Sequence, residues 1–130
     1  MDGIEFYEVK ERPDFNKNFM RLVKKKRFFS LPEQIKDLKE KFEGGEFEGD
    51  KMARRELPVP HEIYKVRLPN PDTNVGKSDG YRVIYMVVVE NKIVVLLTMY
   101  YKKEDATVSD VYINGLIDGY FMNSLPEEEE

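Results

Sequence analysis

The chain has 130 residues, of which 41% are hydrophobic and 35% are charged, and its formal net charge is −4. This length suits one domain with one core, and no apolar run approaches the roughly 18 residues that a membrane span needs. The chain has no cysteine, which excludes disulfides and cysteine-based zinc sites. The first ten residues lack the basic and apolar regions of a signal peptide, so we expect a cytoplasmic protein.

The charge is distributed unevenly along the chain. Residues 104–130 contain eight acids and no lysine or arginine, so the preceding residues carry a net charge of +4. A mildly basic body followed by an acidic C-terminus is compatible with an anionic partner, although the signal is weak.

The first predicted elements are a strand and a helix. Residues 4–9 alternate enough for a strand, and the segment RPDFNKNF that begins at residue 12 starts a helix. Pro13 suits the first helical turn, and Asp14 suits the positive end of the helix dipole. The apolar stripe of this helix consists of Phe15, Phe19, Leu22 and Val23.

A second helix follows after a short break. Ser30 is the expected N-cap, with Glu33 three residues later as its capping-box partner. Gly44 and Gly45 end this helix. Its apolar stripe is Ile35, Leu38 and Phe42. The two helices together predict a helical hairpin after the first strand.

The middle of the chain predicts strands. Residues 44–60 show no period and read as a connecting loop, and residues 62–68 form a strand that prolines terminate. The turn-rich segment 70–80 is long enough for a functional or flexible loop. Two further strands, 81–89 and 92–101, are joined by a tight turn at Glu90 and Asn91.

The C-terminal part predicts a helix over residues 107–121 and a solvated acidic tail. The face of this helix that should pack on the core holds Val108, Tyr112, Ile113, Leu116, Ile117 and Tyr120. We therefore expect an α+β domain over residues 1–122 with the order β-α-α-β-β-β-α, and a tail over 123–130. The sheet should be small and mostly antiparallel, with the helical hairpin packed on one face.

Basic side chains occur on the predicted strands, where apolar ones would pack better. Because strand side chains alternate, Lys65 and Arg67 share one face, and Arg82 can join them if the register permits. Lys102 and Lys103 follow the last strand. A cationic face of this kind would attract a phosphodiester, and arginine can bind two phosphate oxygens. The alternative is an ordinary solvated sheet face, on which lysine and arginine are common.

Three segments give the sequence a resemblance to a known family. They are YKVRL (64–68), GYRVIY (80–85) and VVLLTMYYKKED (94–105). Their order and spacing resemble those of the RelE/ParE superfamily of bacterial type II toxin–antitoxin toxins, and most of all the RelE/HigB-like members. The resemblance also covers the helical hairpin and spans about residues 4–120.

The resemblance implies an endoribonuclease that cleaves messenger RNA at the ribosome, inhibits translation and is silenced by a cognate antitoxin. The implied reaction uses no metal and no small-molecule cofactor: a ribose 2′-hydroxyl attacks the adjacent phosphate. By resemblance, Lys65 and Arg67 take the base and charge-stabilising roles, and Arg82 holds the scissile phosphate. Lys102 or Lys103 matches the basic residue after the last strand.

Three further residues are candidate substrate contacts: Lys77 in the loop, Tyr85 and His61. HigB-like relatives often use a histidine, and His61 is the chain's one histidine, although an ordinary loop histidine is the simpler interpretation. Tyr85 could stack on a base, although its side of the strand favours a core position. The family's C-terminal tyrosine has no clear match, because Tyr112 and Tyr120 are expected to be core residues.

The resemblance leaves two other functions open. A ParE-like toxin would inhibit DNA gyrase and cleave nothing, and a degenerate relative would act only as a protein-binding module. The acidic net charge favours these alternatives, because nuclease toxins of this type are usually strongly basic. The clustered Lys65, Arg67 and Arg82 favour the nuclease.

Overall fold

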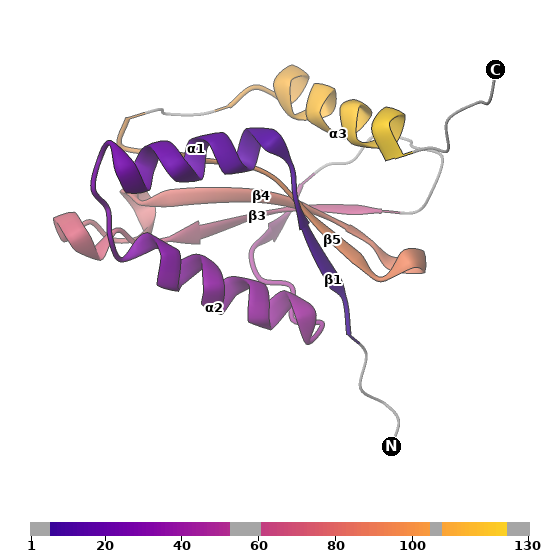
Figure 1. Cartoon of the computed structure of the whole chain (residues 1–130), viewed down its shortest axis with the longest axis horizontal. Coiled ribbons are helices and arrows are strands. Elements are labelled where there is room, and N and C mark those ends of the chain that lie inside the picture. The colour runs from indigo at the N-terminus through magenta and orange to yellow at the C-terminus, as the bar shows by residue number, and fades with distance from the viewer. Residues whose placement is uncertain (1–5, 53–60, 105–107, 125–130) are drawn as a thin grey trace.

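The fold comes from a computed structural model that describes residues 6–52, 61–104 and 108–124 (Figure 1). Within these residues a five-stranded sheet has the order β1-β5-β4-β3-β2. The strands are β1 (Glu8–Glu11), β2 (Asp50–Lys51), β3 (Glu62–Leu68), β4 (Tyr81–Val88) and β5 (Ile93–Tyr101). The helices are α1 (Pro13–Lys24), α2 (Leu31–Glu43) and α3 (Asp110–Ser124). The predicted α+β class is confirmed.

The helical hairpin packs on one face of the sheet. Alternate residues of β4 meet the buried faces of α1 and α2. The α1 and α2 residues of this core are Phe15, Leu22, Leu31, Ile35, Leu38 and Phe42, and they meet Tyr81, Val83, Tyr85 and Val87 of β4. The predicted apolar stripes of both helices are therefore confirmed, and burial of this surface holds the hairpin against the sheet.

The opposite face carries a second core. The other residues of β4 and β5 meet α3 there, through Ile84, Met86, Val88, Val95, Leu97, Ile113, Ile117 and Tyr120. Because both faces are covered, all eight residues of β4 are buried. The sequence predicts a cover for only one face, whereas α3 lies over the other (Figure 1).

The edge strands differ most from the prediction. β1 pairs in parallel with β5 from Glu8 to Glu11, so it lies later than the predicted strand 4–9, whose first two residues fall outside the described ranges. The backbone N–H of Tyr7 instead donates to the carbonyl of Glu43 at 3.0 Å. Tyr7, one of the residues on which the strand prediction rests, is thus bound to the last residue of α2.

β2 lies within the segment predicted as a loop. Asp50 and Lys51 pair with Lys65 and Tyr64 in antiparallel register. Gly49 has a φ of +106°, and a Cβ there would lie 2.5 Å from the Lys65 carbonyl oxygen. A two-residue strand shows no alternation, so the sequence pattern cannot reveal it. The rest of the predicted loop, residues 53–60, lies outside the described residues.

The second helix begins without its predicted capping box. Ser30 makes no side-chain bond to the helix, and its own backbone is helical. Its N–H and Oγ instead donate to the carboxylate of Asp72, at 3.0 and 3.1 Å. Ser30 is thus the N-cap residue, as predicted, but the predicted capping box is wrong, because the Ser30 hydroxyl binds Asp72, which is distant in sequence.

The segment between β3 and β4 is an ordered loop. It contains two 3₁₀ turns, Pro71–Thr73 and Lys77–Asp79, and a bridge between Asn70 and Val75. Asn70 is fully buried, and its side chain accepts a hydrogen bond from the N–H of Asp72. The loop is therefore held in place beside the ends of β3 and β4.

The chain reverses direction between β4 and β5 by a 3₁₀ turn, Val89–Asn91, followed by Lys92 at a φ of 55°. α3 begins at Asp110, where the Tyr112 N–H donates to Ser109 Oγ at 3.1 Å, and ends at Ser124. The predicted start at residue 107 and most of the acidic tail lie outside the described residues. In the described part of the chain, no helix is long and apolar enough to cross a membrane.

Candidate functional site

Three side chains form a row across neighbouring strands. Arg67 of β3 lies directly opposite Arg82 of β4, and Arg82 lies opposite Tyr100 of β5. Directly opposed residues point to the same face, so the register permits Arg82 to share a face with Arg67. We call Arg67, Arg82 and Tyr100 the cross-strand row. It lies at the end of the sheet beside the loop between β3 and β4.

Arg82 is the buried member of this row and is 5% exposed. Its Nη1 donates to the carbonyl of Lys77 at 2.8 Å, and its Nη2 donates to that of Ser78 at 2.9 Å. Burial lowers the pKa of the Arg82 guanidinium, and the nearby charge of Arg67 lowers it further. The guanidinium therefore fastens the loop that precedes β4.

The other predicted cations surround the row. Arg67 is exposed, and Lys65 is half-buried two residues away on the same face of β3. Lys77 is exposed in the loop. Lys102 is half-buried and Lys103 exposed, and the Lys102 N–H donates to the carbonyl of Gly80 at 2.8 Å. That bond ties the turn after β5 to the start of β4, next to Arg82.

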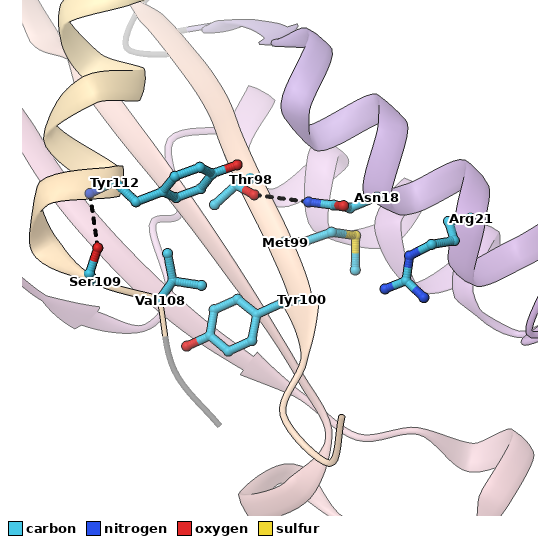
Figure 2. Close-up of a pocket in the computed structure, with 8 residues that line it drawn as sticks. All are labelled: Asn18, Arg21, Thr98, Met99, Tyr100, Val108, Ser109 and Tyr112. Atoms are coloured by element: carbon cyan, nitrogen blue, oxygen red, sulfur yellow. Dashed lines mark hydrogen bonds between the residues drawn. The ribbon is translucent and has the colours of Figure 1, made fainter. Parts of the chain in front are cut away.

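A pocket of about 370 Å³ adjoins the row between α1, β5 and α3 (Figure 2). We call it the α1–α3 pocket. Its lining residues are Asn18, Arg21, Thr98, Met99, Tyr100, Val108, Ser109 and Tyr112. Tyr100 belongs to both features, so the pocket and the cross-strand row are continuous.

One carboxylate links three residues that line this pocket, Asn18, Thr98 and Tyr112. Asp14 of α1 accepts hydrogen bonds from Thr98 Oγ1 on β5 and from the hydroxyl of Tyr112 on α3. Asn18 donates to Asp14 and to Thr98, at 3.2 Å in each case. The network ties two helices to the strand and fixes how Tyr112 projects into the pocket (Figure 2).

Tyr112 is not the core residue that the helical pattern predicts. It is 42% exposed, whereas Ile113 and Ile117 carry the packing. Burial, with a further contribution from the hydrogen bond to Asp14, raises its pKa to about 12. The phenol therefore stays protonated near neutral pH, and its single O–H is donated to Asp14. α3 is apolar almost all round, so its sequence could not show which residues face outward.

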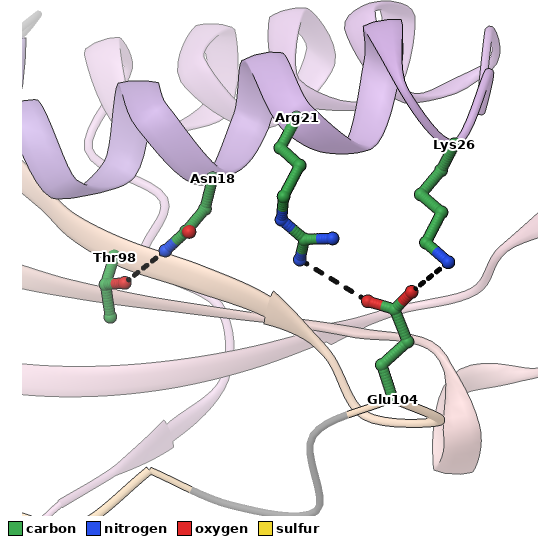
Figure 3. Close-up of polar contacts among 5 residues, drawn as sticks. All are labelled: Asn18, Arg21, Lys26, Thr98 and Glu104. Carbon is green, nitrogen blue, oxygen red and sulfur yellow. Dashed lines mark hydrogen bonds and ion pairs between the residues drawn. The ribbon is translucent and has the colours of Figure 1, made fainter.

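Two basic residues, one in α1 and one in the loop after it, share one acid (Figure 3), and one of the two, Arg21, also lines the pocket. Glu104 contacts Arg21 at 3.3 Å and Lys26 Nζ at 2.6 Å. Burial alone would raise the pKa of the Glu104 carboxyl, but Lys26 and Arg21 together lower it. The carboxylate is therefore charged near neutral pH and partly neutralises the cations beside the pocket.

The structure does not bring Tyr85 or His61 to the row. Tyr85 is fully buried on the hairpin face, where its ring lies 4.1 Å from that of Phe42 and its hydroxyl donates to the Glu48 carbonyl. A base could not stack on it, so the substrate-contact prediction is wrong. His61 is 3% exposed, and an extended strand places it about 20 Å from Arg67.

Metal binding finds no support in the described ranges. No group of three or more histidine, aspartate or glutamate side chains is arranged there to hold an ion. The exposed cations beside the row can bind anions, although Glu104 already pairs with two of the cations near the pocket.

Comparison with known proteins gives structural matches alone. No protein-family model and no curated protein matches the sequence. The isolated E. coli RelE toxin has 24% identity over 86% of this chain and 97% of its own, with a TM-score of 0.47. A mutant of the E. coli toxin RelE in the free state has 18% identity over 92% and 99%, with a TM-score of 0.51.

An archaeal RelE–RelB complex from Pyrococcus horikoshii OT3 also matches, with 20% identity over 75% of this chain and 96% of the other, and a TM-score of 0.41. The likeness to the E. coli mutant, which spans nearly all of both chains, establishes the architecture. On this ground, together with the sheet order and the two cores, the chain has a RelE-like toxin fold.

Proposed function

We propose that this protein is the toxin of a type II toxin–antitoxin system and cleaves messenger RNA at the ribosome. The observation that carries the proposal is the cross-strand row. Two arginines sit directly opposite each other beside a pocket lined by hydroxyl groups. Like charges in this position are unfavourable unless an anion joins them, and a phosphodiester is such an anion.

The proposed reaction is transesterification without hydrolysis. The 2′-oxygen forms a bond to phosphorus, and the bond between phosphorus and the 5′-oxygen breaks. A base takes the proton of the 2′-hydroxyl, and an acid gives one to the leaving 5′-oxygen. Cations stabilise the extra negative charge on the phosphorane. The products are a 2′,3′-cyclic phosphate and a 5′-hydroxyl.

The row divides these tasks between its arginines. Arg82 already donates from both terminal nitrogens to backbone carbonyls, so we assign it to positioning the loop. Arg67 is exposed, and we assign it to the scissile phosphate. Lys65, on the same face, is the proposed base. Lys102 or Lys103 is the proposed acid, because an ammonium group can release a proton to the leaving oxygen.

Tyr112 is a further proposed contact that the sequence did not single out. Its single O–H is donated to Asp14, so the phenol oxygen is left as an acceptor in the pocket, where it would accept a hydrogen bond from a ribose hydroxyl. Lys77 is exposed in the loop that Arg82 fastens, and it is the proposed contact to a neighbouring phosphate.

We propose that a cognate antitoxin silences this site. The motifs YKVRL and GYRVIY resemble those of toxins with such partners, and one structurally similar archaeal protein is a RelE–RelB complex. An acidic antitoxin segment would complement the exposed Arg67 and Lys103. Co-expression with a neighbouring small open reading frame should relieve toxicity and yield a complex that copurifies.

Inhibition of DNA gyrase without cleavage is the second candidate. The observation in its favour is Glu104, which occupies two cations near the site, in a chain of net charge −4. Ribosome binding demands strong positive charge, whereas a protein target does not. Arrested replication with intact messenger RNA would identify this function.

The test is induced expression in a bacterial host, followed by mapping of messenger RNA 5′ ends. Wild type should create new cleavage sites within translated frames, and Arg67→Gln should not. Lys36→Gln is the matched control, because it removes one charge from an exposed position of α2. Intact messenger RNA in the wild-type culture would exclude the nuclease.

A further inference from the structure

Both oxygens of the Glu104 carboxylate are engaged by cations from one segment. Oε1 lies 3.3 Å from Arg21 Nη2, and Oε2 lies 2.6 Å from Lys26 Nζ (Figure 3). The acid therefore sits between two positive groups in the way that a phosphate with two exposed oxygens would. Carboxylate and phosphate are interchangeable partners of an arginine.

We propose that Arg21 and Lys26 form a second phosphate-binding subsite, which Glu104 occupies when no RNA is bound. The inference rests on the proposed function, because it extends the same RNA-binding surface. The ligand is an RNA phosphodiester next to the scissile one. Glu104 then acts as an internal competitor that RNA must displace.

The subsite is continuous with the candidate site. Arg21 lines the α1–α3 pocket together with Tyr100 and Tyr112. Tyr100 belongs to the cross-strand row, opposite Arg82. An RNA strand that places one phosphate at Arg67 can therefore follow the pocket wall to Arg21 without leaving the described surface.

The ion pairs are suited to displacement. The side chains of Arg21, Lys26 and Glu104 are 37%, 44% and 26% exposed, so water and ligands reach all three. Ion pairs at such exposed positions contribute little to stability and weaken with salt. A polyanion that offers several phosphates at once can take their place.

The competition also accounts for the chain's charge. Glu104 is the first of the eight acids that make the C-terminal part acidic, and it directly follows Lys102 and Lys103. Glu104 thus neutralises part of the positive charge of the preceding residues, at Arg21 and Lys26. RNA binding should be restrained by this one carboxylate more than by the net charge.

The experiment measures binding of a short single-stranded 2′-O-methyl RNA, which cannot undergo the proposed cleavage, by fluorescence anisotropy over a range of salt. Glu104→Gln keeps the shape of the side chain and removes its charge. Each additional phosphate contact should tighten binding about fivefold at 0.1 M salt. It should also make the slope of log binding constant against log salt concentration more negative by about 0.7. Thermal melts confirm that each variant is folded.

Two further variants separate the local effect from net charge. Glu90→Gln makes the same change of charge in the turn between β4 and β5 and should leave affinity nearly unchanged. Arg21→Gln should weaken binding strongly in the Glu104→Gln background and little in wild type, because Glu104 already occupies Arg21 there. This dependence on background is the signature of competition.

Several results would overturn the inference. They are equal gains from Glu90→Gln and Glu104→Gln, an equal effect of Arg21→Gln in both backgrounds, and no binding by any variant. An equal gain in affinity for an oligoglutamate peptide would assign the subsite to an acidic protein instead. If messenger RNA is cleaved in cells but Glu104 does not compete with RNA, the proposed function is supported and the subsite is not. If Glu104 competes with RNA but no cleavage occurs, the subsite is supported and the nuclease function is not.

Discussion

Arg67 and Arg82 lie directly opposite each other on β3 and β4, one exposed and the other buried. Like charges at such positions repel, so burial first and the charge of Arg67 second lower the pKa of the Arg82 guanidinium. Arg82 is held by carbonyls of the adjacent loop, whereas the side chain of Arg67 is exposed to solvent. The two arginines therefore have different tasks, and substitutions can separate them.

Arg82→Gln should lower the free energy of unfolding by about 1–3 kcal/mol, because it removes the hydrogen bonds that the charged guanidinium donates to the carbonyls of Lys77 and Ser78. Arg67→Gln should leave stability unchanged or raise it by up to about 1 kcal/mol, because it removes the cross-strand repulsion. Urea unfolding of both variants measures the difference. Equal destabilisation would show that Arg67 also has a structural role.

Tyr85→Ala should lower the free energy of unfolding by about 3–5 kcal/mol, since it empties a fully buried site. Tyr85→Phe should cost only about 1 kcal/mol, from loss of the hydrogen bond to Glu48, and should keep activity. Unfolding curves of the two variants measure their stability, and toxicity assays measure their activity. A Tyr85→Phe variant that is folded but inactive would show that the Tyr85 hydroxyl has a role in activity.

Gly80→Ala should destabilise the protein by about 1–3 kcal/mol. A Cβ at Gly80 would lie 2.0 Å from the Leu68 carbonyl oxygen and 3.0 Å from that of Gly76, and both are backbone atoms. Gly76→Ala is the control, because its Cβ would meet nothing within 4 Å. Thermal unfolding of the two should diverge, and similar melting points would contradict the close packing of this loop.

Tyr112 should ionise late in an alkaline titration. Its pKa is raised to about 12, so it stabilises the fold fully below pH 10, and this contribution is lost as the pH rises towards 12. The absorbance difference between wild type and Tyr112→Phe near 295 nm should therefore remain flat through pH 10. A step centred on pH 10 would contradict the hydrogen bond to Asp14.

The central strands were predictable because β3 alternates and because β4 and β5 are β-branched runs joined by a short polar turn. Residues 62–68 form β3 as predicted, whereas the pairing of Arg67 with Arg82 depends on a register that the sequence left open. The α1 and α2 stripes were predictable because apolar side chains recur at helical spacing. The three-segment resemblance anticipated the RelE-like fold, which the structure confirms.

The remaining features depend on contacts that no local pattern reveals. Ser30 satisfies every sequence requirement of a helix cap, yet Asp72 accepts its hydrogen bonds. Arg82 is an alternating strand residue in sequence, but the loop carbonyls bury it. Tyr112 enters the site because α3 packs through Ile113 and Ile117. Each depends on segments distant in the sequence, so the fold was easier to predict than the site.

The most direct test of the central claim is the chemistry of the RNA ends. Purified protein, ribosomes and a messenger RNA in the act of translation should yield fragments with a 5′-hydroxyl and a 2′,3′-cyclic phosphate. A 2′-deoxy substitution at the cleaved nucleotide, or Arg67→Gln in the protein, should abolish them. Fragments with 5′-phosphate ends, or messenger RNA that stays intact with the wild-type protein, would contradict the account.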